Sequence, residues 1–211
     1  ILSDEKKMSK SLGNILDPLQ IINDYGIDEL RYYLIKEVSL GNDGNISLSN
    51  LKNCINNDLA NNYGNLCQRV FSFINKNCSN KLPKPIKLKK VDEELINDLK
   101  DNLPKMITLM DRQELNSYLK MVINFSFNAN KYFNDLQPWA LKKTDPGRMN
   151  TILYVISIQI KNISILLNPI IPNATNKILD LLNIPKTFRN LDSINTFNFN
   201  HEKELGEVNI L

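Results

Sequence analysis

The sequence predicts a mainly α-helical fold, in which a helix bundle follows a cationic loop and two short helices. Apolar residues recur every three or four positions in most segments after residue 46, which is the spacing of an amphipathic helix. Residues 146–167 are apolar on nearly every side, as is typical of the central helix of a bundle. With 211 residues and 42% hydrophobic side chains, the chain is long enough for one sizeable domain or two small ones.

Two short helices are expected before residue 45. The first starts at Asp17-Pro18, an N-cap acceptor followed by a proline at the first helical position, and Gly26 ends it. The second starts at Asp28, and turn residues at 41–45 close this region. The residues expected to point inward are Leu19, Ile22, Tyr25, Leu30, Tyr33, Leu34 and Val38, and those expected to point outward are Arg31 and Lys36.

A long helix is expected from a serine cap at residue 47 or 49 to about residue 77. Asn61, Asn65 and Arg69 stand four apart in it, so they stack along one face. That face lies roughly 80–160° from the centre of the apolar stripe, so these side chains are free to contact something other than the core. The stripe consists of Ile55, Leu59, Leu66, Val70, Phe73 and Ile74.

The remaining segments complete the bundle. A basic, extended linker at 79–90 precedes a helix at 92–110, which Pro104 is expected to kink or restart. A helix at 113–133 comes next, and Asp145-Pro146 opens the apolar helix that ends near residue 167. A short helix is expected to end at residue 182, followed by a mixed extension with one possible strand. The inward residues expected in 113–133 are Leu115, Leu119, Val122, Ile123 and Phe127.

Composition narrows the function classes. The net charge of +3 permits a nucleic-acid partner without requiring one. Cys54, Cys67 and Cys78 are odd in number and lack metal-ligand spacing, so we expect reduced thiols in a cytoplasmic protein. His201 is the only histidine, which excludes histidine pairs as acid–base catalysts within these residues. No uninterrupted apolar run is long enough for a membrane span, so we expect no membrane partner. The chain begins at Ile1, and we expect it to be a piece of something longer.

The stretch Lys7-Met8-Ser9-Lys10-Ser11 has the composition of a loop that closes over a polyphosphate. Lysine ammonium groups act as point charges, and serine hydroxyl and backbone N–H groups supply directional hydrogen bonds. A solvated, charged loop is the alternative interpretation of the same residues.

These residues, together with several motifs further along, resemble methionyl-tRNA synthetases of class I. The shared motifs run through residues 7–14, Asp17-Pro18, 25–34, 37–44, 57–69 and Pro138-Trp139. Isoleucyl-, valyl-, leucyl- and cysteinyl-tRNA synthetases share the loop and a related bundle, but the spacing of Asn65, Arg69 and Pro138-Trp139 favours the methionine family. The resemblance implies a mainly α fold: the anticodon-binding helix bundle of class I aminoacyl-tRNA synthetases, preceded by a KMSKS loop and a short helical stem-contact region.

The resemblance implies that the loop acts in ATP-dependent charging of tRNA(Met) with methionine, a ligase step of translation. Lys10, Lys7 and Ser9 would act in catalysis, and Met8 and Ser11 would complete the ATP-binding loop. ATP with Mg²⁺ is the expected cofactor set of the full-length enzyme, and none is expected to bind these residues alone. The nucleotide-binding catalytic fold and its two histidines are not in this sequence, so we expect no catalysis by residues 1–211 on their own.

The resemblance also implies an anticodon site for the CAU triplet, with the tryptophan against the cytosine. Its residues would be Asn65, Arg69, Trp139, Pro138 and Asn61. Each has an ordinary alternative: a core tryptophan, asparagines between or on helices, and an arginine that is solvated or in a salt bridge. A stand-alone tRNA-binding module without catalysis, or a helical scaffold with no RNA role, would carry the same bundle. A fully buried Trp139 would favour the scaffold.

The expected organisation is a KMSKS loop and stem-contact region at 1–45, an anticodon-binding bundle at 46–184, and a C-terminal extension at 185–211 that packs on the bundle or is partly flexible. No metal site is expected. The turn at 42–45 is like part of an EF-hand loop, but it lacks the downstream glutamate. Acidic residues at 93–101 have the pattern of a solvated helix face.

Overall fold

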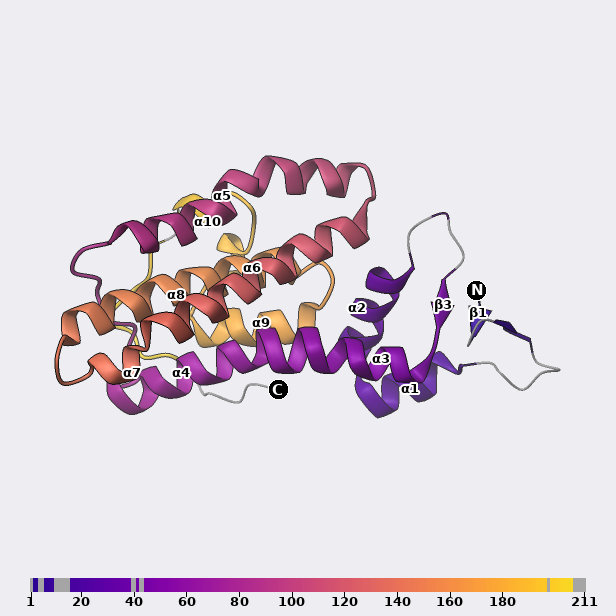
Figure 1. The fold of residues 1–211 in the computed structure, drawn as a ribbon, viewed down its shortest axis with the longest axis horizontal. Helices are drawn as coiled ribbons and strands as arrows, with labels where there is room; N and C mark the ends of the chain where they lie inside the picture. Colours follow the sequence, from indigo (N-terminus) through magenta and orange to yellow (C-terminus); the bar gives the residue numbers. More distant parts are fainter. Residues whose placement is uncertain are drawn as a thin grey trace.

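The structure, a computed structural model, describes residues 2–3, 6–9, 16–38, 41, 44–196 and 198–206; of residues 2, 3, 6, 7 and 195 it describes the backbone alone. The molecule is elongated (Figure 1). A small sheet and two short helices occupy one end, and a bundle of long helices forms the rest. The mainly helical bundle that the sequence predicts is confirmed.

The small sheet was not predicted. Strand β1 (Leu2–Ser3) pairs antiparallel with β2 (Lys6–Lys7) and parallel with β3 (Asn45–Ile46), in the order β2-β1-β3. Strands of two residues are too short to show the alternation of apolar and polar side chains by which strands are found in a sequence. The sheet joins the start of the chain to the turn region that follows the two short helices.

Helix α1 (Pro18–Tyr25) begins and ends where the sequence predicts, with the Asp17 carboxylate accepting from the Leu19 N–H at 2.9 Å. Its buried residue is Ile21, however, while Leu19 is 69% exposed, so the prediction that Leu19 points inward was wrong. Apolar residues at 19, 21 and 22 point in different directions around the helix, at about 100° per residue. In so short a helix, this pattern does not decide which of them faces the core.

Helix α2 (Ile27–Glu37) also differs in the face that it buries. Tyr32 and Tyr33 are fully buried, and Leu34, expected inside, is 37% exposed. The tyrosines tolerate full burial because each hydroxyl has a partner: that of Tyr33 donates to the Ser47 carbonyl at 3.2 Å, and that of Tyr32 donates to the Asp58 carboxylate at 2.7 Å.

The long helix predicted at 47–77 is present but has a π-helical middle. It runs as α3 (Leu48–Cys54), the π-helix η2 (Ile55–Gly64) and α4 (Asn65–Asn77), along the length of the molecule (Figure 1). Ser47 is its cap, accepting from the Asn50 N–H at 3.1 Å. In a π-helix each residue turns the chain by less than the ~100° of an α-helix, so the buried face shifts along η2.

The bundle proper is made of long helices, with an extended segment at 78–89 between α4 and α5 and shorter connections between the helices that follow. Helix α8 is central: it packs against α4, α5, α6, α7 and α9, and nearly all of its residues are buried. It is long and apolar enough to cross a membrane, yet 83% of that apolar window is buried inside the bundle, as in a core helix. The elements after α4 are α5 (Lys90–Asp111), α6 (Leu115–Leu136), α7 (Pro138–Leu141), α8 (Pro146–Leu167), α9 (Pro172–Leu181), the 3-10 helix η3 (Lys186–Phe188) and α10 (Ser193–Thr196).

The structure decides between the two outcomes expected at Pro104 and corrects one expectation about α6. Helix α5 continues through Pro104 as one helix, so it does not start again there. In α6, Phe127 is 51% exposed, and the neighbouring Phe125 is buried instead. Positions 125 and 127 differ by about 200° around a helix, so only one of them can face the core.

A buried ion pair joins three helices of the bundle. The Arg148 guanidinium of α8 donates to Asp92 of α5 at 2.8 Å, and the Tyr132 hydroxyl of α6 donates to the same carboxylate at 2.7 Å. Burial would raise the pKa of Asp92, but hydrogen bonds from Arg148, the Lys89 N–H and Tyr132 hold it below its usual value. This network ties α5 and α6 to the central helix.

Candidate functional site

A cluster of one arginine, two aromatic rings and one asparagine lies at the end of the bundle away from the small sheet. Arg69 of α4 lies over two aromatic rings, with its guanidinium carbon 5.2 Å from the ring centre of Phe133 and 5.8 Å from that of Trp139. The rings of Phe133 and Trp139 meet edge to face, with centroids 5.6 Å apart at 71°. The Arg69 guanidinium also donates to the Asn134 side-chain oxygen at 2.7 Å. The site therefore draws on α4, α6 and α7.

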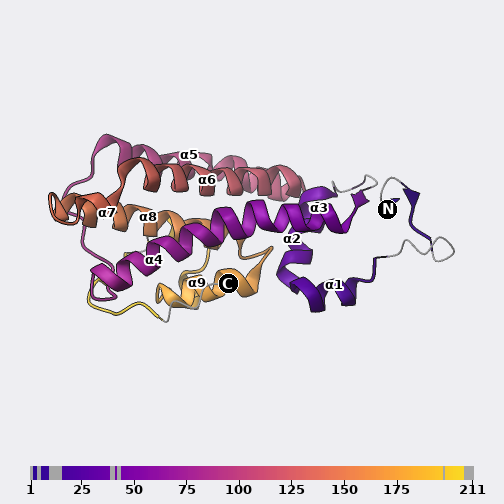
Figure 2. The ribbon, with the colours of Figure 1, turned by 60° about the horizontal axis from the view of Figure 1, so that its bottom comes forward.

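A left-handed turn presents Trp139. Gln137, with a φ of 42°, ends α6 and leads directly into Pro138, the first residue of α7. Pro138 is buried, whereas Trp139 remains 42% exposed, so the ring contacts Phe133 and Arg69 and is still partly open to solvent. The burial of Trp139 that a pure scaffold would show is not found. Figures 1 and 2 both place α7 beside the end of α4 that is remote from the strands.

The predicted asparagines lie along the same helix. Asn61 and Asn65 are exposed, two turns and one turn before Arg69. The structure thus brings Arg69 and Trp139 together and places the two asparagines, both exposed, earlier along the same long helix. Within the described part of the chain, the Asn65 carboxamide makes no hydrogen bond and remains available to a partner.

Sequence reasoning missed two members of the cluster, Phe133 and Asn134. Phe133 was expected only as the last residue of an amphipathic helix. Nothing in the sequence links Asn134 to Arg69, because 65 residues separate them. One local signal was available: a short polar and aromatic run directly before Pro138-Trp139.

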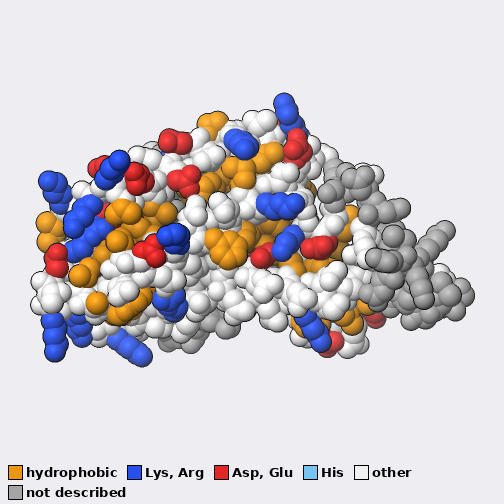
Figure 3. Space-filling model, viewed as in Figure 1, with side chains coloured by type: hydrophobic (Ala, Val, Ile, Leu, Met, Phe, Trp, Pro, Cys, Tyr) orange, Lys and Arg blue, Asp and Glu red, His pale blue; other side chains and the backbone are white. Residues whose placement is uncertain are grey.

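Positive side chains gather at this end of the molecule (Figure 3). Lys142 and Lys143 are exposed directly after α7, and Lys131 is exposed on α6, where it pairs with Asp135 at 2.6 Å. Exposed lysines beside an aromatic ring and a planar guanidinium form a surface suited to a single-stranded nucleic acid.

The KMSKS loop lies only partly among the described residues. Met8 and Ser9 are half-buried, and Lys7 is described by its backbone, in β2. Lys10 and Ser11, together with the Lys7 side chain, lie outside the described residues. The described strands lie at the opposite end of the molecule from α7 (Figure 1).

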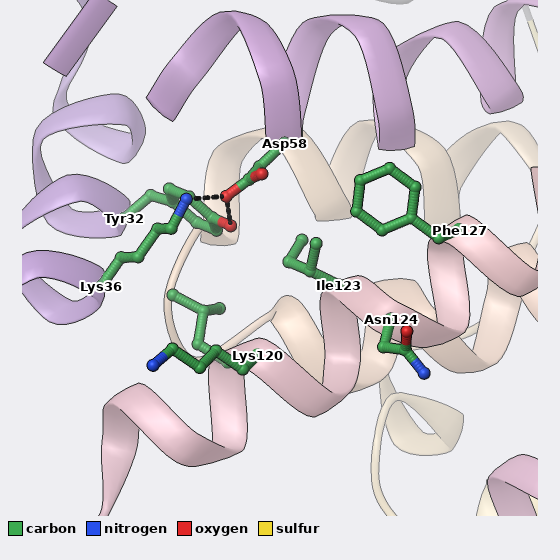
Figure 4. Close-up of a pocket in the computed structure, with 8 residues that line it drawn as sticks. Tyr32, Lys36, Asp58, Lys120, Ile123, Asn124 and Phe127 are labelled. Carbon is green, nitrogen blue, oxygen red and sulfur yellow. Dashed lines mark hydrogen bonds and ion pairs between the residues drawn. The ribbon is translucent and has the colours of Figure 1, made fainter. Parts of the chain in front are cut away.

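A cavity of about 230 Å³ lies where α2 meets the bundle (Figure 4). Asp58 of η2 accepts from the Tyr32 hydroxyl at 2.7 Å and from the Lys36 ammonium at 2.6 Å, both on α2. Burial and the Asp58 carboxylate raise the pKa of Tyr32. These polar groups are hydrogen-bonded to one another. The contact therefore connects α2 to the bundle and is not an acid–base pair for catalysis. The α6 wall of the cavity carries Lys120, Ile123, Asn124 and Phe127.

Metal and thiol chemistry have little support. Among the described residues, no group of three or more histidine, cysteine, aspartate or glutamate side chains could hold a metal ion. Burial raises the pKa of Cys54 to about 12 and that of Cys78 above its usual value. Burial likewise raises the pKa of Cys67. Such thiols are poor nucleophiles at neutral pH.

Comparisons with known proteins cover most of the chain and agree with one another. A family model described as the anticodon binding domain of methionyl tRNA ligase matches residues 82–198, and a model of class I (M) tRNA synthetases matches residues 1–71. The methionine–tRNA ligase of Brucella suis is 42% identical over 180 residues, which make up 85% of this chain and 35% of that protein. That of Rickettsia felis is 40% identical over 190 residues, 89% of this chain and 37% of that protein.

Solved structures show the same likeness. The Mycobacterium tuberculosis methionyl-tRNA synthetase in complex with methionyl-adenylate superposes with a TM-score of 0.91 at 33% identity, covering 98% of this chain and 42% of that one. The apo form of the same enzyme gives 0.86 at 31% identity, covering 92% of this chain and 40% of that one. The chain spans about a third of the length of the curated relatives that it matches.

The helical bundle and these matches place the chain among class I aminoacyl-tRNA synthetases that have a helical anticodon-binding domain. The model of the methionyl domain covers more than half of the 211 residues. The chain therefore belongs to the methionyl-tRNA synthetase family and corresponds to its C-terminal region. The match to the methionyl family excludes the isoleucyl-, valyl-, leucyl- and cysteinyl-tRNA synthetase families as alternatives for this chain.

Proposed function

We propose that this chain recognises the CAU anticodon of tRNA(Met) within a methionine–tRNA ligase, which charges that tRNA with methionine at the expense of ATP. The exposed Trp139 ring beneath the Arg69 guanidinium is the observation that carries the proposal. We divide the work among a KMSKS loop and stem-contact region at 1–45, an anticodon-binding bundle at 46–184 and a C-terminal extension at 185–211.

In this proposal each site residue has a distinct task. Trp139 stacks on the cytosine, since an unpaired base presents a flat face to an aromatic ring. Arg69 offers a planar set of donors, and Asn65 offers an amide with both a donor and an acceptor for base edges. Pro138 fixes the direction of the chain where it turns from α6 into α7, and with it the direction of Trp139. Asn61 extends the line of polar side chains along the RNA strand.

The KMSKS loop acts in the first chemical step. The carboxylate of methionine attacks the α-phosphorus of ATP, a new oxygen–phosphorus bond forms, and the bond to pyrophosphate breaks. Lys10 neutralises the charge that collects on the leaving phosphates, and Lys7 and Ser9 support it. Met8 and Ser11 complete the loop, and Mg²⁺ bound with the nucleotide would add further neutralisation.

We infer that residues 1–211 alone bind tRNA without forming methionyl-adenylate, because their single histidine cannot supply the pair that this chemistry uses. On their own they would behave as a tRNA-binding module. We place the full enzyme in the cytoplasm, where translation occurs and buried cysteines stay reduced.

A binding titration tests the proposal. Residues 1–211 are titrated with tRNA(Met) and with the same tRNA carrying a substituted anticodon, at one stated salt concentration. The chain should prefer the CAU tRNA, and Trp139→Ala should weaken that binding by about 5- to 150-fold, the range given by one stacked base. Equal affinity for both tRNAs would leave only non-specific, salt-dependent binding and would refute the proposal.

A further inference from the structure

The π-helical segment η2 ends where the candidate RNA-contacting side of α4 begins. The N–H of Asn65 is shared between the carbonyl groups of Ala60 and Asn62, five and three residues earlier. The hydrogen-bond register of the long helix therefore changes at Asn65, where the π-helix η2 ends and α4 begins. Such changes of register are frequent at functional sites, because they alter the direction in which the next side chains point.

A buried network of amide and hydroxyl groups holds this point against α6. The Asn62 side chain is 2% exposed, and its oxygen accepts from the Ser126 hydroxyl at 3.0 Å and from the Asn130 amide at 2.8 Å. The Asn130 amide also donates to the backbone carbonyl of Asn62 at 3.1 Å. The Asn62 amide donates to the Ile123 carbonyl at 3.4 Å. Both ends of the Asn62 side chain are thus fixed.

Helix α6 is therefore hydrogen-bonded to the long helix on both sides of Asn65. Asn130 holds Asn62, three residues before Asn65, and Asn134, one turn further along α6, holds Arg69, four residues after it. Apolar packing alone would keep the helices together while allowing small rotations. Directional hydrogen bonds fix the rotation as well.

We propose that Asn62, Ser126 and Asn130 are positioning residues for RNA recognition: they set the rotation of α4 so that Asn65 faces the RNA beside Arg69 and Trp139. This inference rests on the proposed anticodon site. Asn65 makes no hydrogen bond within the described residues, so its direction depends on the helix that carries it. Recognition of base edges requires such side chains to be held within about 0.5 Å and 10–20° of the productive geometry.

The test compares Asn130→Ala with the unaltered chain. Both are titrated at fixed salt with tRNA(Met) and with versions carrying single substitutions in the anticodon. The preference for CAU should fall about tenfold in the variant, the size expected when the hydrogen bonds of Asn65 to a base edge, about one or two, are no longer aligned. Affinity for the substituted tRNAs and the dependence on salt should stay the same, since no phosphate contact changes.

Asn128→Ala is the matched control, because Asn128 lies on the same helix but donates to Asp98 of α5 at 3.3 Å, away from the site. It should leave the preference unchanged. Ser126→Ala is a milder second variant that removes one donor to Asn62, and a drop of about threefold is expected. If Asn130→Ala does not fold, Ser126→Ala decides the question.

A double variant separates positioning from simple stability. If Asn130 acts through Asn65, then Asn65→Ala combined with Asn130→Ala should lose no more preference than Asn65→Ala alone. Fully additive losses would overturn the inference, and so would a variant with lowered melting temperature but an intact preference. Failure of the unaltered chain to prefer CAU would instead refute the proposed function, and the inference with it.

Discussion

Replacing Arg69 with lysine tests whether the planar guanidinium, rather than its charge, matters at the site. Arg69 stacks over Phe133 and Trp139 and donates to Asn134. Lysine keeps the charge but loses the flat face and the fork of donors. A partly exposed cation–π contact contributes about 0.5–1 kcal/mol. An exposed hydrogen bond contributes about 0.5–1.5 kcal/mol. These contacts orient the guanidinium in the free chain, and its contacts to a base would be of the same kind and size. The expected loss on binding is therefore about 1.5 kcal/mol, or a dissociation constant about tenfold higher for tRNA(Met).

Fluorescence anisotropy with a labelled CAU stem-loop at several salt concentrations would measure this effect. Because Arg69 is assigned to a base and lysine retains the charge, the slope of log affinity against log salt should not change for Arg69→Lys. Arg112→Lys is the matched control, since Arg112 is exposed at the end of α5. Unaltered affinity in Arg69→Lys, or a reduced salt slope, would refute the assigned role of the guanidinium.

Three further predictions concern the core and the loop. Asp92→Asn should destabilise the fold by about 3 kcal/mol or more in urea at pH 7, because it leaves Arg148 buried without its charge partner. The lowered pKa of Asp92 contributes stability that is present above the ordinary carboxyl pKa and lost as the pH falls through its folded value, so urea midpoints of the unaltered chain should fall more steeply in acid than those of the variant. Burial and then the nearby Lys100 lower the pKa of Lys161 to about 8. Between about pH 8 and 10 the unfolded chain therefore binds more protons than the folded one, so the free energy of unfolding should rise by about 1.4 kcal/mol per pH unit relative to Lys161→Met. Parallel curves of stability against pH for the two proteins would contradict the assignment. In a full-length enzyme, Lys10→Ala should abolish most ATP–pyrophosphate exchange yet leave tRNA binding intact, and unchanged exchange would remove Lys10 from the first step.

Helix boundaries were largely predictable because local side chains set them. Asp145-Pro146 starts α8 as expected, with the Asp145 carboxylate accepting from the Arg148 N–H at 2.9 Å. Gly26, with a φ of 108°, ends α1 in a conformation that favours glycine. The apolar residues on nearly every side of 146–167 likewise predicted α8 as the central helix.

What could not be predicted depends on distant partners or on backbone register. A π-helix has no distinctive side-chain pattern, so the burial of Asp58 and Asn62 in η2 came only from the structure. Phe127 has the spacing of a core residue, but α6 turns Phe125 toward the core and leaves Phe127 exposed on another side. Asn134 enters the site through a contact between two helices far apart in the sequence. The roles of Asn61, Asn65, Arg69, Pro138 and Trp139 toward RNA remain predictions.

The central claim is that Trp139 stacks on an anticodon base, and the protein offers a direct reporter because Trp139 is its only tryptophan. Intrinsic fluorescence of residues 1–211 is followed while a CAU stem-loop is added, and in parallel while a stem-loop with the cytosine replaced is added. Stacking should quench the emission with the CAU RNA, along a curve that matches its binding curve, and the substituted RNA should quench little at equal occupancy. Saturating CAU RNA that leaves the Trp139 emission unchanged would contradict the claim.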